Sequence, residues 1–306
     1  MRFDVIQMRI LVLGGTGLIG NRLTRQLRQN ADVYASTRSS LVEMPVLENV
    51  LEPNKWIFGL DATDFQFLES EINRLKPDVV VNCFGVVKHQ INSKNAEATI
   101  LLNSILPWRL SELAEKYDFK LIHLSTDCVF SGETGNYKES STPDALDLYG
   151  RSKILGELNN ARDLTLRTSF VGREIKTFAN FFEWVQRSHN TKIVGYKRAI
   201  YSGLTTQAIS EVIEKLIFDF SGLTGLWHVS SEPISKYDLI CMLNHSLNLK
   251  LDIESNEEFC CDRSLDSTAF ASMTSLVIPN WITMLERYVL EQEWYESILR
   301  NKVGAK

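Results

Sequence analysis

The feature that most constrains the fold of this chain is a glycine-rich segment directly after its first apolar run. Arg9–Leu13 has the pattern of a β-strand, and it is followed by Gly14-Gly15-Thr16-Gly17-Leu18-Ile19-Gly20 and then by a helical segment at 21–29. Glycine permits a tight strand-to-helix turn and lets another group approach the backbone closely. A strand, turn and helix in this order favour an α/β fold.

The following segments repeat this alternation. Strands are expected at 32–36, 56–59, 78–83, 120–125 and 164–168, and helices at 65–75, 96–117 and 149–158, with a bend or restart of the second helix at Pro107. The run at 78–83 is rich in valine, which is typical of a strand that is covered on both faces. The sequence therefore predicts a Rossmann-type α/β fold with a doubly wound parallel sheet.

The regular alternation loosens after Thr168, which predicts two structural parts. Residues 1–168 are expected to form the Rossmann domain, and residues 169–306 are expected to form mainly a smaller substrate-binding lobe. Within this lobe, residues 203–230 are expected to return to the Rossmann domain, with a strand at 226–229 in the main sheet. Further helices are expected at 178–188, 205–218, 235–247 and 279–299, whereas 192–201 is basic and irregular.

Composition excludes several classes of protein. The 306 residues are 44% hydrophobic and 23% charged, as in soluble globular proteins, and the formal charge of −5 argues against a large nucleic-acid surface. Five scattered cysteines do not form a disulfide framework or a zinc site. No segment approaches the roughly 20 apolar residues of a membrane span. We expect a soluble, cytoplasmic protein without a bound metal, and without a nucleic-acid or membrane partner.

The glycine segment predicts a dinucleotide site. Its glycines recur every three residues, and a pyrophosphate would lie on the N-terminus of the following helix. A tight turn without a ligand is the alternative interpretation. The residues expected to contact the cofactor here are Gly14, Thr16, Gly17, Leu18, Ile19 and Gly20. Cys83, Phe84 and Gly85, which follow the fourth strand, are expected to reach the same cofactor.

The end of the second strand points to the form of the cofactor. NAD-selective sites place an acid there to bind the ribose 2′-hydroxyl, but this chain has Thr37, Arg38 and Ser39. The planar donors of arginine match the oxygens of a 2′-phosphate, so NADP(H) is expected, with NAD(H) as the alternative. Arg38 as a solvated loop residue is the competing interpretation. Asp61, after the third strand, is expected to contact the adenine, with a solvated loop acid as the alternative interpretation.

A proton-transfer set is spread over two later segments. Tyr149 and Lys153 are four residues apart and so lie on one helix face. An ammonium beside a phenol is expected to lower the pKa of the tyrosine toward working pH. Thr126 follows the strand at 120–125, at the sheet edge where open α/β folds bind ligands, and its hydroxyl can polarise a carbonyl group. We therefore expect Thr126, Tyr149 and Lys153 to be catalytic.

With these residues the chain resembles the extended short-chain dehydrogenase/reductases, specifically the dTDP-4-dehydrorhamnose reductase group. The resemblance is clear over residues 8–168, and 225–230 still resembles the group. It is carried by Gly14, Gly17 and Gly20, by Ser125-Thr126-Asp127-Cys128-Val129-Phe130, by Tyr149-Gly150-Arg151-Ser152-Lys153 with Gly156-Glu157, and by Leu166-Arg167-Thr168.

The resemblance implies NADPH-dependent reduction of the 4-keto group of a nucleotide-activated (6-)deoxysugar, as in deoxysugar or polysaccharide biosynthesis. Thr126 would polarise the keto group, Tyr149 would donate the proton, and Lys153 would hold the nicotinamide ribose and tune Tyr149. Val129 and Phe130 would wall the sugar pocket. A 4,6-dehydratase is less expected, because that branch has a second carboxylate where this chain has Cys128.

Cys128 is a departure, since many members of the group have tyrosine there. In related branches a cysteine at this place moves ring protons, which implies a bifunctional 3,5-epimerase/4-reductase as an alternative. That role needs a thiol pKa lowered by nearby cations and a second proton carrier, for which the early part of the lobe offers His189 or Lys192. The other interpretation is a buried apolar filler.

The remaining expectations concern partners. Lys88 is expected near the edge of the site, and Lys192, Lys197 and Arg198 are expected to bind the diphosphate of the nucleotide sugar, although a solvated basic loop is the alternative. Arg263 is a second candidate for the same role. A non-catalytic, NADP-binding regulatory subunit, as in the β subunit of methionine adenosyltransferase, is a competing class of function. A homodimer is the default expectation for the assembly.

Overall fold

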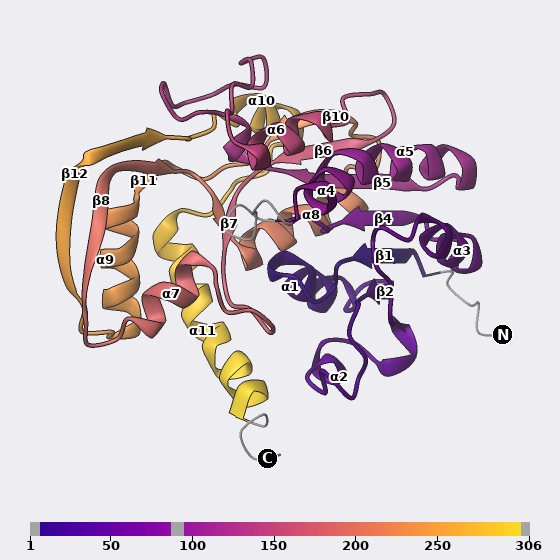
Figure 1. Ribbon diagram of the computed structural model, residues 1–306, viewed down its shortest axis with the longest axis horizontal. Coiled ribbons are helices and arrows are strands. Elements are labelled where there is room, and N and C mark those ends of the chain that lie inside the picture. Colours follow the sequence, from indigo (N-terminus) through magenta and orange to yellow (C-terminus); the bar gives the residue numbers. More distant parts are fainter. Residues whose placement is uncertain (1–6, 87–94, 301–306) are drawn as a thin grey trace.

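The computed structural model describes residues 7–86 and 95–300, and its centre is a seven-stranded parallel sheet (Figure 1). The strand order is β10-β6-β5-β4-β1-β2-β3, so the chain reverses direction across the sheet between β1 and β4. Ligands bind at such a switch point in open α/β sheets. The predicted doubly wound sheet is confirmed. Its strands are β1 (Arg9–Leu13), β2 (Asp32–Ser36), β3 (Trp56–Ile57), β4 (Val79–Asn82), β5 (Lys120–Ser125), β6 (Leu164–Arg167) and β10 (Gly225–His228).

Helices cover both faces of the sheet because alternate residues of each strand point to opposite faces. In β1, Ile10 and Val12 belong to the core shared with α1 (Leu18–Leu27) and α8 (Thr206–Phe218). Leu11 and Leu13 belong to the core shared with α3 (Phe65–Leu75) and α5 (Leu106–Tyr117). Two hydrophobic cores, one on each face, therefore hold the sheet between the helices.

The helix expected at 96–117 is divided into three parts. A short α4 (Ala96–Ile100) runs into a π-helical turn, η3 (Leu101–Ile105), and α5 then restarts with Pro107 in its first turn. Proline lacks a backbone N–H, which is tolerated at the start of a helix but not in its interior. The expected restart at Pro107 is confirmed, and η3 lies immediately before it.

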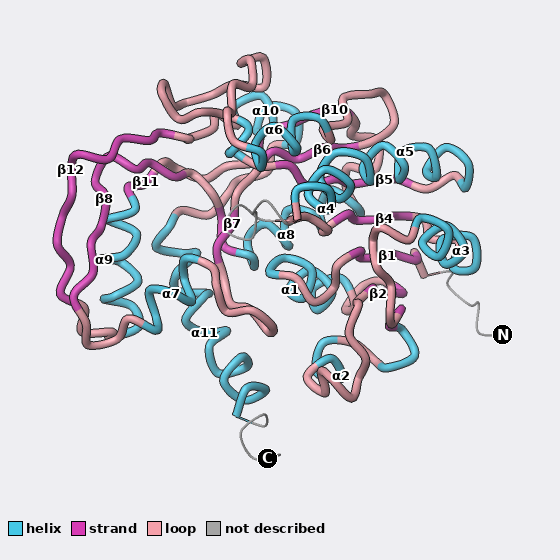
Figure 2. The backbone as a smooth tube through the Cα atoms, viewed as in Figure 1, coloured by secondary structure: helices cyan, strands magenta, loops and turns pink. Residues whose placement is uncertain are grey.

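The later residues add a three-stranded sheet in the order β11-β8-β12. β8 (Lys192–Tyr201) pairs parallel with β12 (Asp252–Asp262) and antiparallel with β11 (Ile234–Ser235). The three strands lie side by side in Figure 2. The expectation that 192–201 is irregular is wrong. Ile193 and Gly195 are buried in alternation, but three consecutive exposed residues at 196–198 break the period of two in the sequence.

β10 pairs parallel with β6, so the strand expected at 226–229 joins the main sheet. The remaining helices are α7 (Phe181–Arg187), α9 (Lys236–Leu247), α10 (Thr268–Thr274), α11 (Trp281–Arg300), α6 (Leu148–Leu155) and the short α2 (Leu47–Val50), with single 3-10 turns at η1 (Pro53–Lys55) and η4 (Asp127–Val129). β7 (Phe170–Val171) and β9 (Leu204–Thr205) form a parallel pair.

The C-terminal helix α11 is attached to α1, the helix that follows the glycine loop. The Tyr295 hydroxyl donates to Asn21 Oδ1 at 3.0 Å, and Arg22 Nε lies 2.6 Å from Glu291 Oε1. Tyr295 is fully buried in the same core cluster as the strand residues. The last described helix of the chain and the helix after the glycine loop are therefore parts of one packed structure.

Candidate active site

The glycine loop has the geometry that a dinucleotide pyrophosphate requires. The N-cap of α1 is Gly17, which makes no side-chain capping bond, and the first turn holds no acid. The first N–H groups of α1 and the positive end of its dipole are therefore free for an anion. A Cβ at Gly20 would lie 2.1 Å from the carbonyl oxygen of Gly14, so only glycine lets the helix pack this closely on the loop.

Two other predicted segments meet the glycine loop. The backbone N–H of Gly14 donates to Ser36 Oγ at 3.0 Å, which joins the loop to the end of β2. The N–H of Cys83 donates to the carbonyl oxygen of Leu13 at 3.0 Å, and a Cβ at Gly14 would lie 3.1 Å from the ring of Phe84. The structure thus brings the segment after β4, which includes Gly85, to the same edge as the loop.

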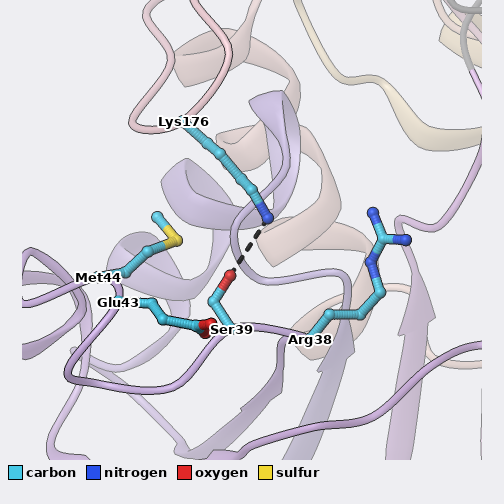
Figure 3. Close-up of a pocket in the computed structure, with 5 residues that line it drawn as sticks. All are labelled: Arg38, Ser39, Glu43, Met44 and Lys176. Carbon is cyan, nitrogen blue, oxygen red and sulfur yellow. Dashed lines mark hydrogen bonds between the residues drawn. The ribbon is translucent and has the colours of Figure 1, made fainter.

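A pocket of about 600 Å³ opens beyond the end of β2 (Figure 3). It contains the predicted Arg38 and Ser39, and three residues not predicted for this site complete its lining: Glu43, Met44 and Lys176. Asp61 lies near this region, where hydrogen bonds from Thr63 hold the pKa of its carboxyl below the usual value and the charge of Arg38 acts in the same direction. The buried Thr37 accepts a hydrogen bond from the backbone N–H of Ser39.

The predicted hydroxyl pair comes together at the carboxyl end of β5. Thr126 is the N-cap of η4, and its side chain lies close to the Tyr149 hydroxyl from the first turn of α6, where it opposes the rise of the tyrosine pKa. The Thr126 hydroxyl also donates to Asp127 Oδ1 at 3.1 Å. α6 approaches this closely because residue 150 is glycine: a Cβ there would lie 2.4 Å from the carbonyl oxygen of Cys128.

Lys153 lies one turn further along α6 and makes a different contact from the one expected. Its ammonium donates to the carbonyl oxygen of Leu124 at 2.7 Å. Burial lowers the pKa of Lys153 to about 8, while the charge of Glu157 acts in the opposite direction. Burial raises the pKa of Tyr149, and the neighbouring thiol of Cys128 adds to this increase. The expectation that Lys153 lowers the pKa of Tyr149 is wrong for this structure, because burial dominates and the ammonium faces a backbone carbonyl.

A buried ion pair holds the end of α6 against the sheet. Arg167 of β6 donates to both oxygens of Glu157, at 2.7 Å from Nε and 2.7 Å from Nη2. Ser125 is the last residue of β5, and its hydroxyl donates to the same carboxylate at 2.7 Å. Two strands and the segment after α6 are thereby joined, next to Thr126.

Asn103 is a positioning residue that sequence reasoning missed. Its side chain accepts from Val86 N–H at 2.9 Å and donates to the Val86 carbonyl oxygen and to Ser152 Oγ, both at 3.1 Å. It therefore fixes the segment after β4 against α6. No sequence signal identified it, since its placement depends on the π-helical turn η3.

The structure corrects two expectations about the segment after Thr126. Val129 and Phe130 are fully buried, in a cluster where the Phe130 ring stacks on Tyr137 with centroids 4.1 Å apart, so neither side chain walls a pocket. Burial raises the pKa of the Cys128 thiol to about 12, and the Asp127 charge acts in the same direction. The lowered pKa that proton abstraction by Cys128 requires is absent here.

The basic residues expected to bind substrate are dispersed. Lys192 is the first residue of β8, exposed and 2.9 Å from Glu254. Tyr201, the last residue of the strand, lies nine residue steps further along, or roughly 30 Å. Arg198 is exposed on the same strand. Arg263 lies close to the site, where its guanidinium donates to the carbonyl oxygen of Phe130 at 2.8 Å and its charge acts on Asp127 and Cys128. Lys88 lies outside the described residues.

Lys236 is a cation near the site that was not predicted. Its ammonium lies 3.7 Å from the ring centroid of Tyr201 and 4.4 Å from that of Phe181. In the described part of the chain it forms neither a hydrogen bond nor an ion pair. Burial lowers its pKa to about 8, and the charge of Asp127 opposes this shift. Lys236 is the first residue of α9 (Lys236–Leu247), and no motif in the sequence indicates that its side chain lies over two aromatic rings.

Within residues 7–86 and 95–300, no group of three or more His, Cys, Asp or Glu side chains is placed to hold a metal ion. No helix in these ranges is long and apolar enough to span a lipid bilayer.

The parallel sheet, the glycine loop and the Thr126–Tyr149–Lys153 set together define an extended short-chain dehydrogenase/reductase type of fold. The chain belongs to the family described as "RmlD substrate binding domain", which matches residues 8–289.

The chain is similar to proteins with different described activities. The chain is 28% identical over 237 residues to a probable low-salt glycan biosynthesis reductase, Agl14, of Haloferax volcanii, covering 74% of this chain and 75% of that protein. It is 25% identical over 254 residues to methionine adenosyltransferase 2 subunit beta of Xenopus tropicalis, covering 79% and 72%. The crystal structure of dTDP-4-dehydrorhamnose reductase from Bacillus anthracis in complex with NADP superposes with a TM-score of 0.77 at 21% identity, covering 94% of this chain and 100% of that one.

Proposed function

We propose that this protein reduces the 4-keto group of a nucleotide-activated 6-deoxysugar with NADPH. The observation that carries the proposal is the proximity of Thr126 and Tyr149 at the carboxyl end of β5, with Lys153 one turn along the same helix. The similarity to reductases, one of them solved with NADP, supports the same reaction class. We also propose that the protein is cytoplasmic and forms a homodimer.

Thr126, Tyr149 and Lys153 have different roles in the proposed keto reduction. The bound cofactor supplies the hydride. Tyr149 donates the proton to the keto oxygen, and Thr126 donates a hydrogen bond to the negative charge that develops on that oxygen. Burial raises the pKa of Tyr149, so the phenol holds its proton at neutral pH and is in the form that a reduction requires. By family resemblance, Lys153 holds the nicotinamide ribose.

An additional epimerase activity through Cys128 is the first alternative. Burial raises the pKa of this thiol to about 12, so it is protonated at neutral pH and is not a ready base for a ring proton. The reductase alone is therefore favoured. A reaction in deuterated water distinguishes the two, because an epimerase incorporates deuterium at ring carbons and a simple reductase does not.

A regulatory, non-catalytic subunit is the second alternative, favoured by the similarity to methionine adenosyltransferase 2 subunit beta. The presence of the complete Thr126, Tyr149 and Lys153 set argues for catalysis instead. Binding of NADPH without turnover of any sugar nucleotide would support the regulatory function.

The test is NADPH oxidation by the purified protein with a panel of 4-keto-6-deoxy sugar nucleotides. Tyr149→Phe is expected to lower kcat by roughly 10²- to 10⁴-fold, the usual contribution of a general acid. Tyr117→Phe is the matched control, since Tyr117 lies in α5 and its hydroxyl donates to Glu69 at 2.9 Å. Equal activity of the two variants would exclude Tyr149 as the acid.

A further inference from the structure

We propose that Lys176, together with Arg38 and Ser39, forms a two-cation receptor for the 2′-phosphate of NADP(H). The inference rests on the cofactor in the proposed function and adds a specificity-determining residue to it. Lys176 belongs to the segment between β7 and α7, far in sequence from the glycine loop and from the end of β2. A residue from the second half of the chain would therefore recognise the adenosine end of the cofactor.

The geometry joins the two segments directly. Lys176 Nζ donates to Ser39 Oγ at 3.2 Å, a contact between residues 137 positions apart. Figure 3 shows the Lys176 side chain extending from its own loop toward Ser39, with Arg38 beside Ser39 on the adjacent stretch of chain. All three residues line the same pocket of about 600 Å³.

The charges of this pocket suit a phosphate monoester. Within the described residues, neither Arg38 nor Lys176 forms an ion pair with a carboxylate. Arginine offers several donors in one plane, lysine offers a compact charge with three donors, and the Ser39 hydroxyl adds another donor. A dianionic phosphate accepts several such charge-assisted hydrogen bonds at once, whereas an unmodified ribose hydroxyl does not need them.

The position of the pocket relative to the glycine loop identifies the part of the ligand. Gly14 and Gly15 are hydrogen-bonded to Ser36, the last residue of β2, so the pyrophosphate site and the end of β2 are adjacent. In dinucleotide-binding folds the adenosine ribose lies at the end of this strand. Arg38 and Ser39 follow two and three residues later, where the ribose 2′-substituent would extend.

Glu43 gives the inference a second test. Its carboxylate also lines the pocket and accepts from the backbone N–H of Ser40 at 2.7 Å. A negative charge in the same pocket repels a phosphate dianion and affects an uncharged ribose hydroxyl much less. Glu43→Gln is therefore expected to tighten NADPH binding several-fold without the same effect on NADH.

The experiment measures binding of NADPH and NADH to the full chain by cofactor fluorescence, without any sugar substrate. Lys176→Gln is expected to weaken NADPH about 10- to 100-fold, the value of one charge-assisted hydrogen bond, and to change NADH less than about 2-fold. Lys116→Gln, which removes an exposed lysine charge from α5, is expected to change neither. Adenosine 2′,5′-bisphosphate and AMP are the corresponding probes without nicotinamide.

Two results would overturn the inference: equal weakening of NADPH and NADH by Lys176→Gln, or NADPH binding that the substitution leaves unchanged. Because the readout is binding alone, a failure here leaves the sugar reduction to be judged by turnover. Conversely, a protein that shows the predicted NADPH selectivity but reduces no sugar would support this site while refuting the reductase.

Hydrogen exchange supplies a readout that a merely structural lysine would not affect. NADPH and adenosine 2′,5′-bisphosphate are expected to slow exchange of the amides at 174–179, whereas NADH and AMP are not. Lys176→Gln is expected to abolish this difference. Equal protection by all four ligands would show that the segment does not sense the phosphate.

Discussion

The ammonium of Lys153 donates a 2.7 Å hydrogen bond to the carbonyl oxygen of Leu124, two residues before Thr126. This contact directs the lysine of α6 to the backbone of β5. It also keeps a charged group in a buried position, which lowers the pKa of Lys153 to about 8.

The Lys153 pKa predicts a pH dependence of stability. The pKa is about 8 in the folded state and about 10.4 in an unfolded chain, so between these values the unfolded chain binds more protons and stability increases with pH. Relative to Lys153→Met, the free energy of unfolding of the wild type is expected to rise by about 2–3 kcal/mol from pH 7.5 to pH 10.5. Urea unfolding of both proteins at several pH values measures this difference, and a flat difference would contradict the prediction.

The buried ammonium of Lys236 is expected to lower the stability of the protein and to contribute to substrate binding. Its ammonium lies over Tyr201 and Phe181 without a hydrogen bond in the described structure, and burial lowers its pKa to about 8. Lys236→Met is therefore expected to stabilise the protein by on the order of 2 kcal/mol at pH 7, with a gain that shrinks as pH rises through 8 to 10. If the ammonium contacts the sugar nucleotide, KM rises in the same variant. A lower melting temperature at pH 7 would be the opposite of this expectation.

Removing one partner of the Glu157–Arg167 pair is expected to destabilise the protein strongly, because both groups are buried. Glu157→Gln leaves the Arg167 charge without its partner, which costs roughly 3–5 kcal/mol. Glu115→Gln is the matched control: its pair with Arg162 is exposed, so a change of less than about 1 kcal/mol is expected. Thermal unfolding of the two variants compares them, and similar melting temperatures would refute the prediction.

Gly20→Ala is expected to disrupt the glycine loop. The new Cβ would lie 2.1 Å from the carbonyl oxygen of Gly14, so the loop or α1 must move. We expect a loss of roughly 2 kcal/mol or more in stability and at least a 10-fold weaker dinucleotide affinity. Gly222→Ala is the control, since a Cβ there meets no atom within 4 Å. Unchanged affinity in Gly20→Ala would show that the loop tolerates the shift.

Much of the fold was predictable from local patterns. The strands at 32–36 and 120–125 and the helix at 65–75 lie at the expected residues, because their periodicity and flanking turns are local properties. β8 was missed, since its inward-facing residues do not alternate throughout, and its pairing with β12 joins segments about 60 residues apart. Val129 and Phe130 were assigned to a pocket wall by resemblance, but packing places them in a core cluster.

The sequence by itself determined the doubly wound sheet, the glycine loop and the Thr126, Tyr149 and Lys153 set, because each depends on residues close together in the chain or on strand order. Tertiary structure alone decided the pKa shifts of Tyr149 and Lys153 and the contact between Lys176 and Ser39. A pKa depends on burial and on charges from other elements, and a long-range contact depends on how helices and strands pack. A local pattern of residues therefore predicts neither the pKa shifts nor the long-range contact.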